Sequence, residues 1–293
     1  MSFLSYLING MSLGSVYAII ALGYTMVYGI AKMLNFAHGD IIMIGAYVAF
    51  LAISTLGLPI WVGILLSIVV CTVLGVTIEK LAYKPLRKAT SLSVLITAIG
   101  ISYLLQNTAL LLWSSNPRKF PSIVENKNIV LFDGKLSISN ISLITIGVCL
   151  VIMVALTLFI NKTKTGMAMR ACAEDKGAAA LMGINVNKTI SITFAIGSAL
   201  AAVSAILLCM SYDTITPTLG SMPGIKAFTA AVFGGIGSVP GALVGGLLLG
   251  VIEILAKAYI STELSDAVVF AVLIIVLLIK PAGLLGKKIH EKV

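Results

Sequence analysis

Long apolar segments follow one another along almost the whole chain, separated by short polar stretches. Because about 20 predominantly apolar residues are enough to cross the hydrocarbon core of a bilayer, segments of this length predict transmembrane helices. The pattern predicts eight of them, over residues 4–30, 41–56, 60–79, 91–113, 141–160, 190–210, 241–259 and 264–280. The expected fold class is therefore all-α, a polytopic transmembrane helix bundle of about 8 spans (7–10) with glycine-broken segments.

One further apolar piece, residues 225–236, is shorter than a full crossing. A glycine-rich turn from Gly234 to Gly241 follows it and includes Pro240, so the segment cannot continue as a regular helix. We interpret it either as a half-helix that enters the membrane and turns back or as a ninth span. Breaks of this kind often line a substrate path, which makes Gly241 a candidate path residue. Close helix packing through small residues is the alternative interpretation.

The amino-acid composition excludes a soluble protein. Hydrophobic residues make up 59% of the 293 residues and charged residues 11%, with a mean hydropathy of +1.09, whereas soluble domains average about 25% charged residues. We expect one transmembrane domain over residues 1–293. The four cysteines match no zinc, haem or disulfide spacing, so no metal site is predicted. The formal charge of +9 is divided among short loops, which indicates membrane topology rather than a nucleic-acid partner.

Basic residues collect in three polar segments, which predicts that these segments face the cytoplasm. They are the segment with Lys80, Lys84, Arg87 and Lys88, the loop 161–188 with Lys162, Lys164, Arg170, Lys176 and Lys188, and the tail with Lys287, Lys288 and Lys292. The longest stretch on the opposite side, residues 114–140, is the predicted extracytoplasmic loop. Its acids Glu125 and Asp133, together with their basic neighbours, could dock a binding protein, or the loop could simply be solvated. Charge leaves the side of the N-terminus open.

A polar block separates the first two predicted helices and contains Asn35, His38, Gly39 and Asp40. These side chains are too costly to bury unpaired, so they must lie at an interface, pair with one another or line a cavity. One interpretation is an interfacial turn in which Asp40 complements the dipole of the second helix. The other is the lining of a substrate path, to which Gly14 of the first helix would also contribute.

The segment from Thr165 to Asn185 is alanine-rich, carries several charges and contains Gly183 near its end. This pattern predicts one short amphipathic helix with a glycine stop. Such a helix between long spans could transmit the movement of a partner into the membrane, although a passive surface helix would have the same pattern.

Four blocks in order resemble signatures of the branched-chain amino acid ABC transporter permeases. They are Asn35–Asp40, the loop from Arg170 to Asn185, the turn from Gly234 to Gly241, and Lys280–Gly286. The last block has leucine at position 285 where we would expect phenylalanine. The resemblance implies a partnership with two ABC ATPase subunits, a second related permease subunit and an extracytoplasmic solute-binding protein. It also implies that the loop 161–188 is the coupling element, with Arg170, Glu174, Asp175 and Gly183 as its contact residues.

The chain contains no G-x-x-x-x-G-K-[ST] phosphate-binding loop. We therefore expect a transport subunit that is not itself an enzyme and has no cofactor of its own, with ATP bound by the partner subunit. The predicted location is the bacterial cytoplasmic (inner) membrane, where the multi-pass chain contacts lipid. The predicted substrate path includes Gly14, Asn35, His38, Gly39, Asp40 and Gly241.

Two other classes of protein are alternatives to this function. An ion-coupled secondary transporter or channel would use charged groups at membrane depth, and Lys226, Glu253 and Lys257 are the candidates. Glu253 and Lys257 are also spaced as a simple i,i+4 ion pair. An intramembrane protease is disfavoured because the aspartates of Gly39-Asp40 and Tyr212-Asp213 occur in the wrong order.

Overall fold

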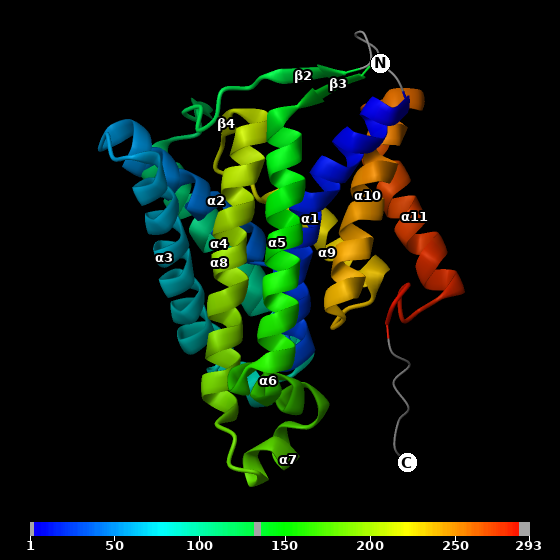
Figure 1. Ribbon diagram of the computed structural model, residues 1–293. Helices are drawn as coiled ribbons and strands as arrows, with labels where there is room; N and C mark the ends of the chain where they lie inside the picture. Colours follow the sequence, from blue (N-terminus) through cyan, green and yellow to red (C-terminus); the bar gives the residue numbers. More distant parts are fainter. Residues whose placement is uncertain (1–2, 132–135, 287–293) are drawn as a thin grey trace. The chain divides into compact units, whose positions relative to one another are not determined.

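The computed structural model describes residues 3–131 and 136–286, and helices dominate it (Figure 1). The α-helices are α1 (Phe3–Ala31), α2 (His38–Phe50), α3 (Ile60–Ile78), α4 (Ser91–Trp113), α5 (Asn140–Lys162), α6 (Lys164–Glu174), α7 (Lys176–Leu181), α8 (Val186–Tyr212), α9 (Ser221–Gly234), α10 (Val239–Tyr259) and α11 (Ser265–Ile279). The π-helical turns η1 (Leu51–Thr55) and η2 (Glu79–Tyr83) extend α2 and α3, and a 3₁₀ turn, η3 (Pro85–Lys88), follows. The strands are β1 (Arg118–Lys119), β2 (Asn128–Leu131), β3 (Leu136–Ser139) and β4 (Thr214–Ile215).

Each of the eight predicted ranges contains a helix, which confirms the all-α fold class. Among the described residues, seven helices are long and apolar enough to cross a membrane. They are α1, α2 with η1, α3 with η2, α4, α5, α8 and α10. The eighth, α11, is a shorter apolar helix of 15 residues. The predicted number of about 8 spans stays a prediction.

The boundaries of several helices follow from local sequence. Side chains of Thr90, Thr163, Asn185 and Ser238 cap α4, α6, α8 and α10 by accepting a hydrogen bond from a backbone N–H in the first turn. Pro240 lies in the first turn of α10, where its missing N–H has no helical partner to lose. The glycine-rich turn therefore ends α9 and starts α10, as the sequence predicted.

Contacts divide the chain into two compact units. In the unit formed by residues 26–125 and 154–225, helices α2, α3 and α8 pack against one another and α4 lies along α2. Strand β1 pairs antiparallel with β4 beyond one end of α8, and α6 and α7 lie at the other end (Figure 1). Small residues allow the helices to approach, because a Cβ at Gly45 would lie 3.2 Å from the Cα of Ala202 on α8.

The other unit is formed by residues 3–25, 126–153 and 226–286 of the described chain. Helix α10 packs against α11 and, through glycines, against the first part of α1. Strands β2 and β3 form an antiparallel hairpin with Asn128 opposite Ser139. Three of the four unit boundaries fall inside α1, α5 and α9, and the fourth lies between β1 and β2. The predicted single domain over residues 1–293 stays a prediction.

Some predicted features lie outside the described residues. They are the basic tail with Lys287, Lys288 and Lys292, and Asp133 of the predicted extracytoplasmic loop.

Candidate functional site

The first turn of α2 holds a carboxylate among neutral polar groups. Asp40 is 2% exposed, and its Oδ1 accepts a hydrogen bond of 2.8 Å from Nε2 of Gln106 on α4. The same Gln106 nitrogen lies 3.2 Å from Oγ of Ser102 and 3.5 Å from Oγ of Ser221, the first residue of α9. Two helical turns, roughly 10 Å, separate Gln106 from the end of α4 at Trp113. Asp40 therefore joins α2, α4 and the start of α9 well inside the predicted span.

Asn35 and His38 are buried in the same unit. The Oδ1 atom of Asn35 accepts a hydrogen bond of 3.0 Å from the hydroxyl of Tyr83 on η2. The ring of Tyr83 packs against Phe194 of α8, with 5.3 Å between ring centroids. The connection between α1 and α2 is thus fixed to α3 and α8 by one polar and one aromatic contact.

Gly39 lies against the backbone that precedes α9. A Cβ at Gly39 would lie 2.5 Å from the carbonyl oxygen of Gly220, so a side chain would force the two segments apart. The structure thus brings Asn35, His38, Gly39 and Asp40 together at the start of α2. The close approach shows that Gly39 permits tight backbone packing. Whether this block lines a substrate path stays a prediction.

The other two predicted path residues, Gly14 and Gly241, lie in the unit that contains α10, and both lie against the backbone of a neighbouring helix. A Cβ at Gly14 would lie 2.7 Å from the Cα of Leu247, and one at Gly241 would lie 2.6 Å from the carbonyl oxygen of Gly234. Both glycines therefore permit close packing, of α1 against α10 and of α9 against α10.

A network of four charged side chains holds three helices of this unit. Glu253 of α10 is 1% exposed, and its Oε1 lies 2.6 Å from Nζ of Lys257 and 2.8 Å from Nζ of Lys226 on α9. Lys226 also contacts Oδ1 of Asp266 on α11 at 2.6 Å. The hydroxyl of Tyr17 on α1 donates to Oε2 of Glu253 at 2.8 Å. Two acids and two lysines make the network neutral.

The predicted i,i+4 pair of Glu253 and Lys257 is confirmed, but the sequence analysis missed the partners on other helices. One signal was available, because charges are expensive in membrane-spanning segments and are expected to pair. Lys226 is an isolated charge and Asp266 lies at the start of an apolar run, and their signs complement each other.

The predicted coupling helix is two helices rather than one. Asp175 has extended backbone angles (φ −152°, ψ 116°), and its Oδ1 accepts hydrogen bonds of 2.7 and 3.0 Å from the N–H groups of Gly177 and Ala178. Because an aspartate competes well for such N–H groups at a helix start, it ends α6 and caps α7. The glycine stop is confirmed, since Gly183 follows α7 with φ +81°.

The tip of this loop exposes both charged and apolar side chains. Arg170, Glu174 and Asp175 are all exposed. Leu181 and Met182 at the end of α7 are 91% and 83% exposed, which the sequence analysis did not single out. Adjacent exposed apolar side chains at a polar surface are suited to contact another protein.

A second polar cluster lies near the start of α8, at the same end of this helix as α6 and α7. Glu79 of η2 is fully buried and pairs with Arg87, which also donates to Asn187 of α8. Ser191 donates to Oε2 of Glu79 at 2.6 Å. Nζ of Lys176 donates to the carbonyl oxygen of Ala31 at 2.7 Å.

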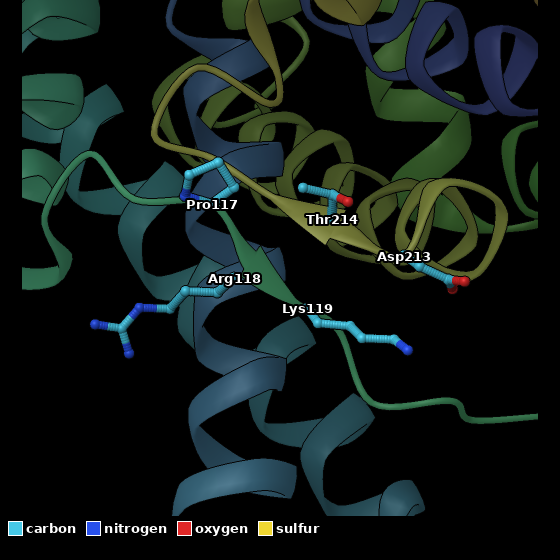
Figure 2. A pocket seen from close by; sticks show the side chains of 5 residues that line it. All are labelled: Pro117, Arg118, Lys119, Asp213 and Thr214. Atoms are coloured by element: carbon cyan, nitrogen blue, oxygen red, sulfur yellow. The ribbon is translucent and has the colours of Figure 1, made fainter.

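A small surface pocket lies beside the paired strands β1 and β4, at the opposite end of α8 (Figure 2). Pro117, Arg118, Lys119, Asp213 and Thr214 line it. The side chains of Arg118 and Lys119 point away from each other (Figure 2). The guanidinium of Arg118 lies 5.8 Å from the ring centroid of Phe50 and donates to the carbonyl oxygen of Trp113 at 3.1 Å. Within the residues that the structure describes, no group of three or more His, Cys, Asp or Glu side chains is placed to hold a metal ion.

Comparisons with known proteins match nearly the whole chain. The sequence model of a family described as "Branched-chain amino acid transport system / permease component" matches residues 6–277. The high-affinity branched-chain amino acid transport system permease protein LivH of Salmonella typhimurium is 47% identical over 301 residues, covering 99% of this chain and 98% of that protein. The corresponding protein BraD of Pseudomonas aeruginosa is 46% identical over 302 residues, with the same coverage.

One solved structure, "PsaBC from Streptococcus pneumoniae in complex with Fab", has a similar fold. Its TM-score is 0.50 and its sequence identity 16%, and the match covers 94% of this chain and 92% of that one. At this identity the likeness concerns the fold alone.

Proposed function

Because this chain belongs to the family of branched-chain amino acid transport permeases, we propose that it forms part of the membrane path of an ABC importer for leucine, isoleucine and valine. The observation that carries the proposal is the identity of 47% with LivH of Salmonella typhimurium along almost the full length of both proteins. The seven long apolar helices place the chain in the membrane, as a multi-pass protein of the bacterial cytoplasmic membrane.

The energy for transport would come from partner subunits. The sequence has no phosphate-binding loop of the Walker type, so ATP would be bound by two ABC ATPase subunits rather than by this chain. A second, related permease and an extracytoplasmic solute-binding protein complete the proposed assembly. ATP binding in the partner would then bias the membrane helices between two conformations.

The loop formed by α6 and α7 is the proposed contact with the ATPase. Its exposed Leu181 and Met182 offer an apolar anchor, and the exposed Arg170 and Glu174 offer polar contacts around it. Buried apolar anchors with a polar rim are the usual composition of protein interfaces. Asp175 and Gly183 act differently in this proposal, since they set the two ends of α7.

The proposed substrate path passes the start of α2. Asn35, His38 and Asp40 bring polar groups to this place, and Gly39 keeps the neighbouring backbone close. A zwitterion with an apolar side chain needs polar groups for its ends and small residues beside its body. The ion-coupled alternative gains no support from the charge network, because Glu253 and Asp266 both contact lysines.

The test is reconstitution. The chain is purified in mild detergent from its native membrane, its companions are identified, and the assembly is placed in proteoliposomes with the binding protein. We expect an ATPase and a second permease to co-purify, and leucine to stimulate both ATP hydrolysis and its own uptake, while glutamate serves as the control solute. A chain that purifies alone and moves leucine under an ion gradient would contradict the proposal.

A further inference from the structure

The C-terminal end of helix α1 has an unusual backbone conformation. Lys32 follows the helix in the left-handed region (φ 57°), and its N–H donates to the carbonyl oxygen of Tyr28 at 2.9 Å. The last carbonyl groups of an α-helix lack partners within the helix. Ala31, the last residue of α1, is 1% exposed, so its carbonyl oxygen needs a partner from elsewhere in the protein.

Lys176, the first residue of α7, supplies that partner from 145 positions away in the sequence. Its Nζ donates to the carbonyl oxygen of Ala31 at 2.7 Å. A cation at the C-terminal end of a helix also interacts favourably with the helix dipole. Both residues belong to the same compact unit. One end of α7 is therefore tied to α1, while the other end carries the exposed Leu181 and Met182.

The short segment after α1 leads directly to the proposed path. Five residues separate Lys32 from His38, where α2 begins. In this segment Asn35 is held by the hydroxyl of Tyr83 at 3.0 Å. The end of α1 is therefore connected to the start of α2, where Asp40 lies, through only five residues.

The ammonium group of Lys176 lies close to two other cations. Burial lowers the pKa of Lys176, and the nearby cations Arg87 and Lys32 lower it further. These two cations oppose a third charge at the same place, so their repulsion offsets part of the attraction between the ammonium group and the helix end.

We propose that Lys176 is a positioning residue for transport, which ties α7 to the end of α1 so that movement of α7 under the ATPase moves the start of α2. This inference rests on the proposed function of the α6–α7 loop. It adds a route through one side chain from the partner's contact surface to the membrane path.

The test compares three variants in the reconstituted assembly. Lys176→Met keeps the length of the side chain and removes the donor, and Lys176→Arg keeps a cationic donor. Lys188→Met removes an exposed lysine in the first turn of α8, directly after this loop, and is the control. Leucine uptake and phosphate release are measured in the same vesicles. We expect leucine moved per ATP hydrolysed to fall about tenfold in Lys176→Met, the size expected for one charged hydrogen bond, and to stay within about twofold of the native ratio in the other two.

Each outcome decides the question. Equal ratios in Lys176→Met and the native protein would overturn the inference, as would an equal loss in Lys188→Met. Failure of Lys176→Met to assemble would overturn it as well, because the contact would then serve folding rather than coupling. If the native assembly itself shows no leucine-stimulated hydrolysis, the proposed function fails before the variants are compared.

Discussion

Charged side chains in the membrane-spanning part of this chain are held by partners from several helices. Glu253 is the centre of the largest such group, with Tyr17, Lys226 and Lys257 as its direct contacts. Only Lys257 lies within reach along the same helix. The other two lie 236 and 27 residues away in the sequence, so helical spacing predicted one contact and could not predict the others.

At the scale of the residue we predict that Glu253→Gln destabilises the protein. The neutral amide would leave Lys257 without its carboxylate and Lys226 with Asp266 alone. Breaking a buried ion pair typically costs about 3 to 5 kcal/mol. The measurement is thermal unfolding in detergent, with Glu263→Gln, an exposed acid, as the control. Equal unfolding temperatures for the two variants would show that the network adds little to stability.

Among the elements, the apolar helices were predictable, and the division of the polar α6–α7 segment into two helices was not. Apolar runs of 20 or so residues locate α1, α4 and α10 to within a few residues, because little besides a helix satisfies the backbone of such a run in a membrane. The break between α6 and α7 was not predicted, because the alanine-rich sequence favours a helix on both sides of Asp175. Only the capping side chain of Asp175 interrupts that helix. Helix α9 has 14 residues, about 21 Å, and is too short to cross the membrane alone.

At the scale of the element we predict that Asp175→Ala loosens α7. Loss of an N-cap side chain typically costs about 1 kcal/mol, which is a large effect on a helix of six residues. Faster hydrogen exchange at the amides of residues 177–181 would report it, together with reduced leucine uptake per ATP. Glu174→Ala, which changes the exposed neighbouring acid, is the control. Unchanged exchange in Asp175→Ala would mean that packing, rather than the cap, holds α7.

For the whole molecule, the structure extends what charge alone could predict. The basic segment after α3, the start of α8, the α6–α7 loop and the end of α1 belong to one unit. The contacts of Arg87 with Asn187 and of Lys176 with Ala31 join these segments. If positive loops face the cytoplasm, this end of α1 is cytoplasmic. Since α1 is one continuous helix of 29 residues, we expect its first residue on the outer side.

We therefore predict that a cysteine at Phe3 reacts with a membrane-impermeant maleimide added outside right-side-out vesicles. A cysteine at Met182 should react only after the vesicles are opened. The four native cysteines are buried and provide a low background. Labelling of Met182→Cys from outside intact vesicles would reverse the orientation deduced from charge.

The glycine contact between α1 and α10 has a thermal consequence. Gly14 of α1 lies against Gly246 and Gly250 of α10, so the surfaces that meet are largely backbone. Bringing them together restricts few side-chain rotamers, and the conformational entropy lost on packing is correspondingly small. Heating penalises such a contact less than one made by interlocking long side chains. The pairing of the two helices is thus suited to persist while other parts of the bundle loosen and move.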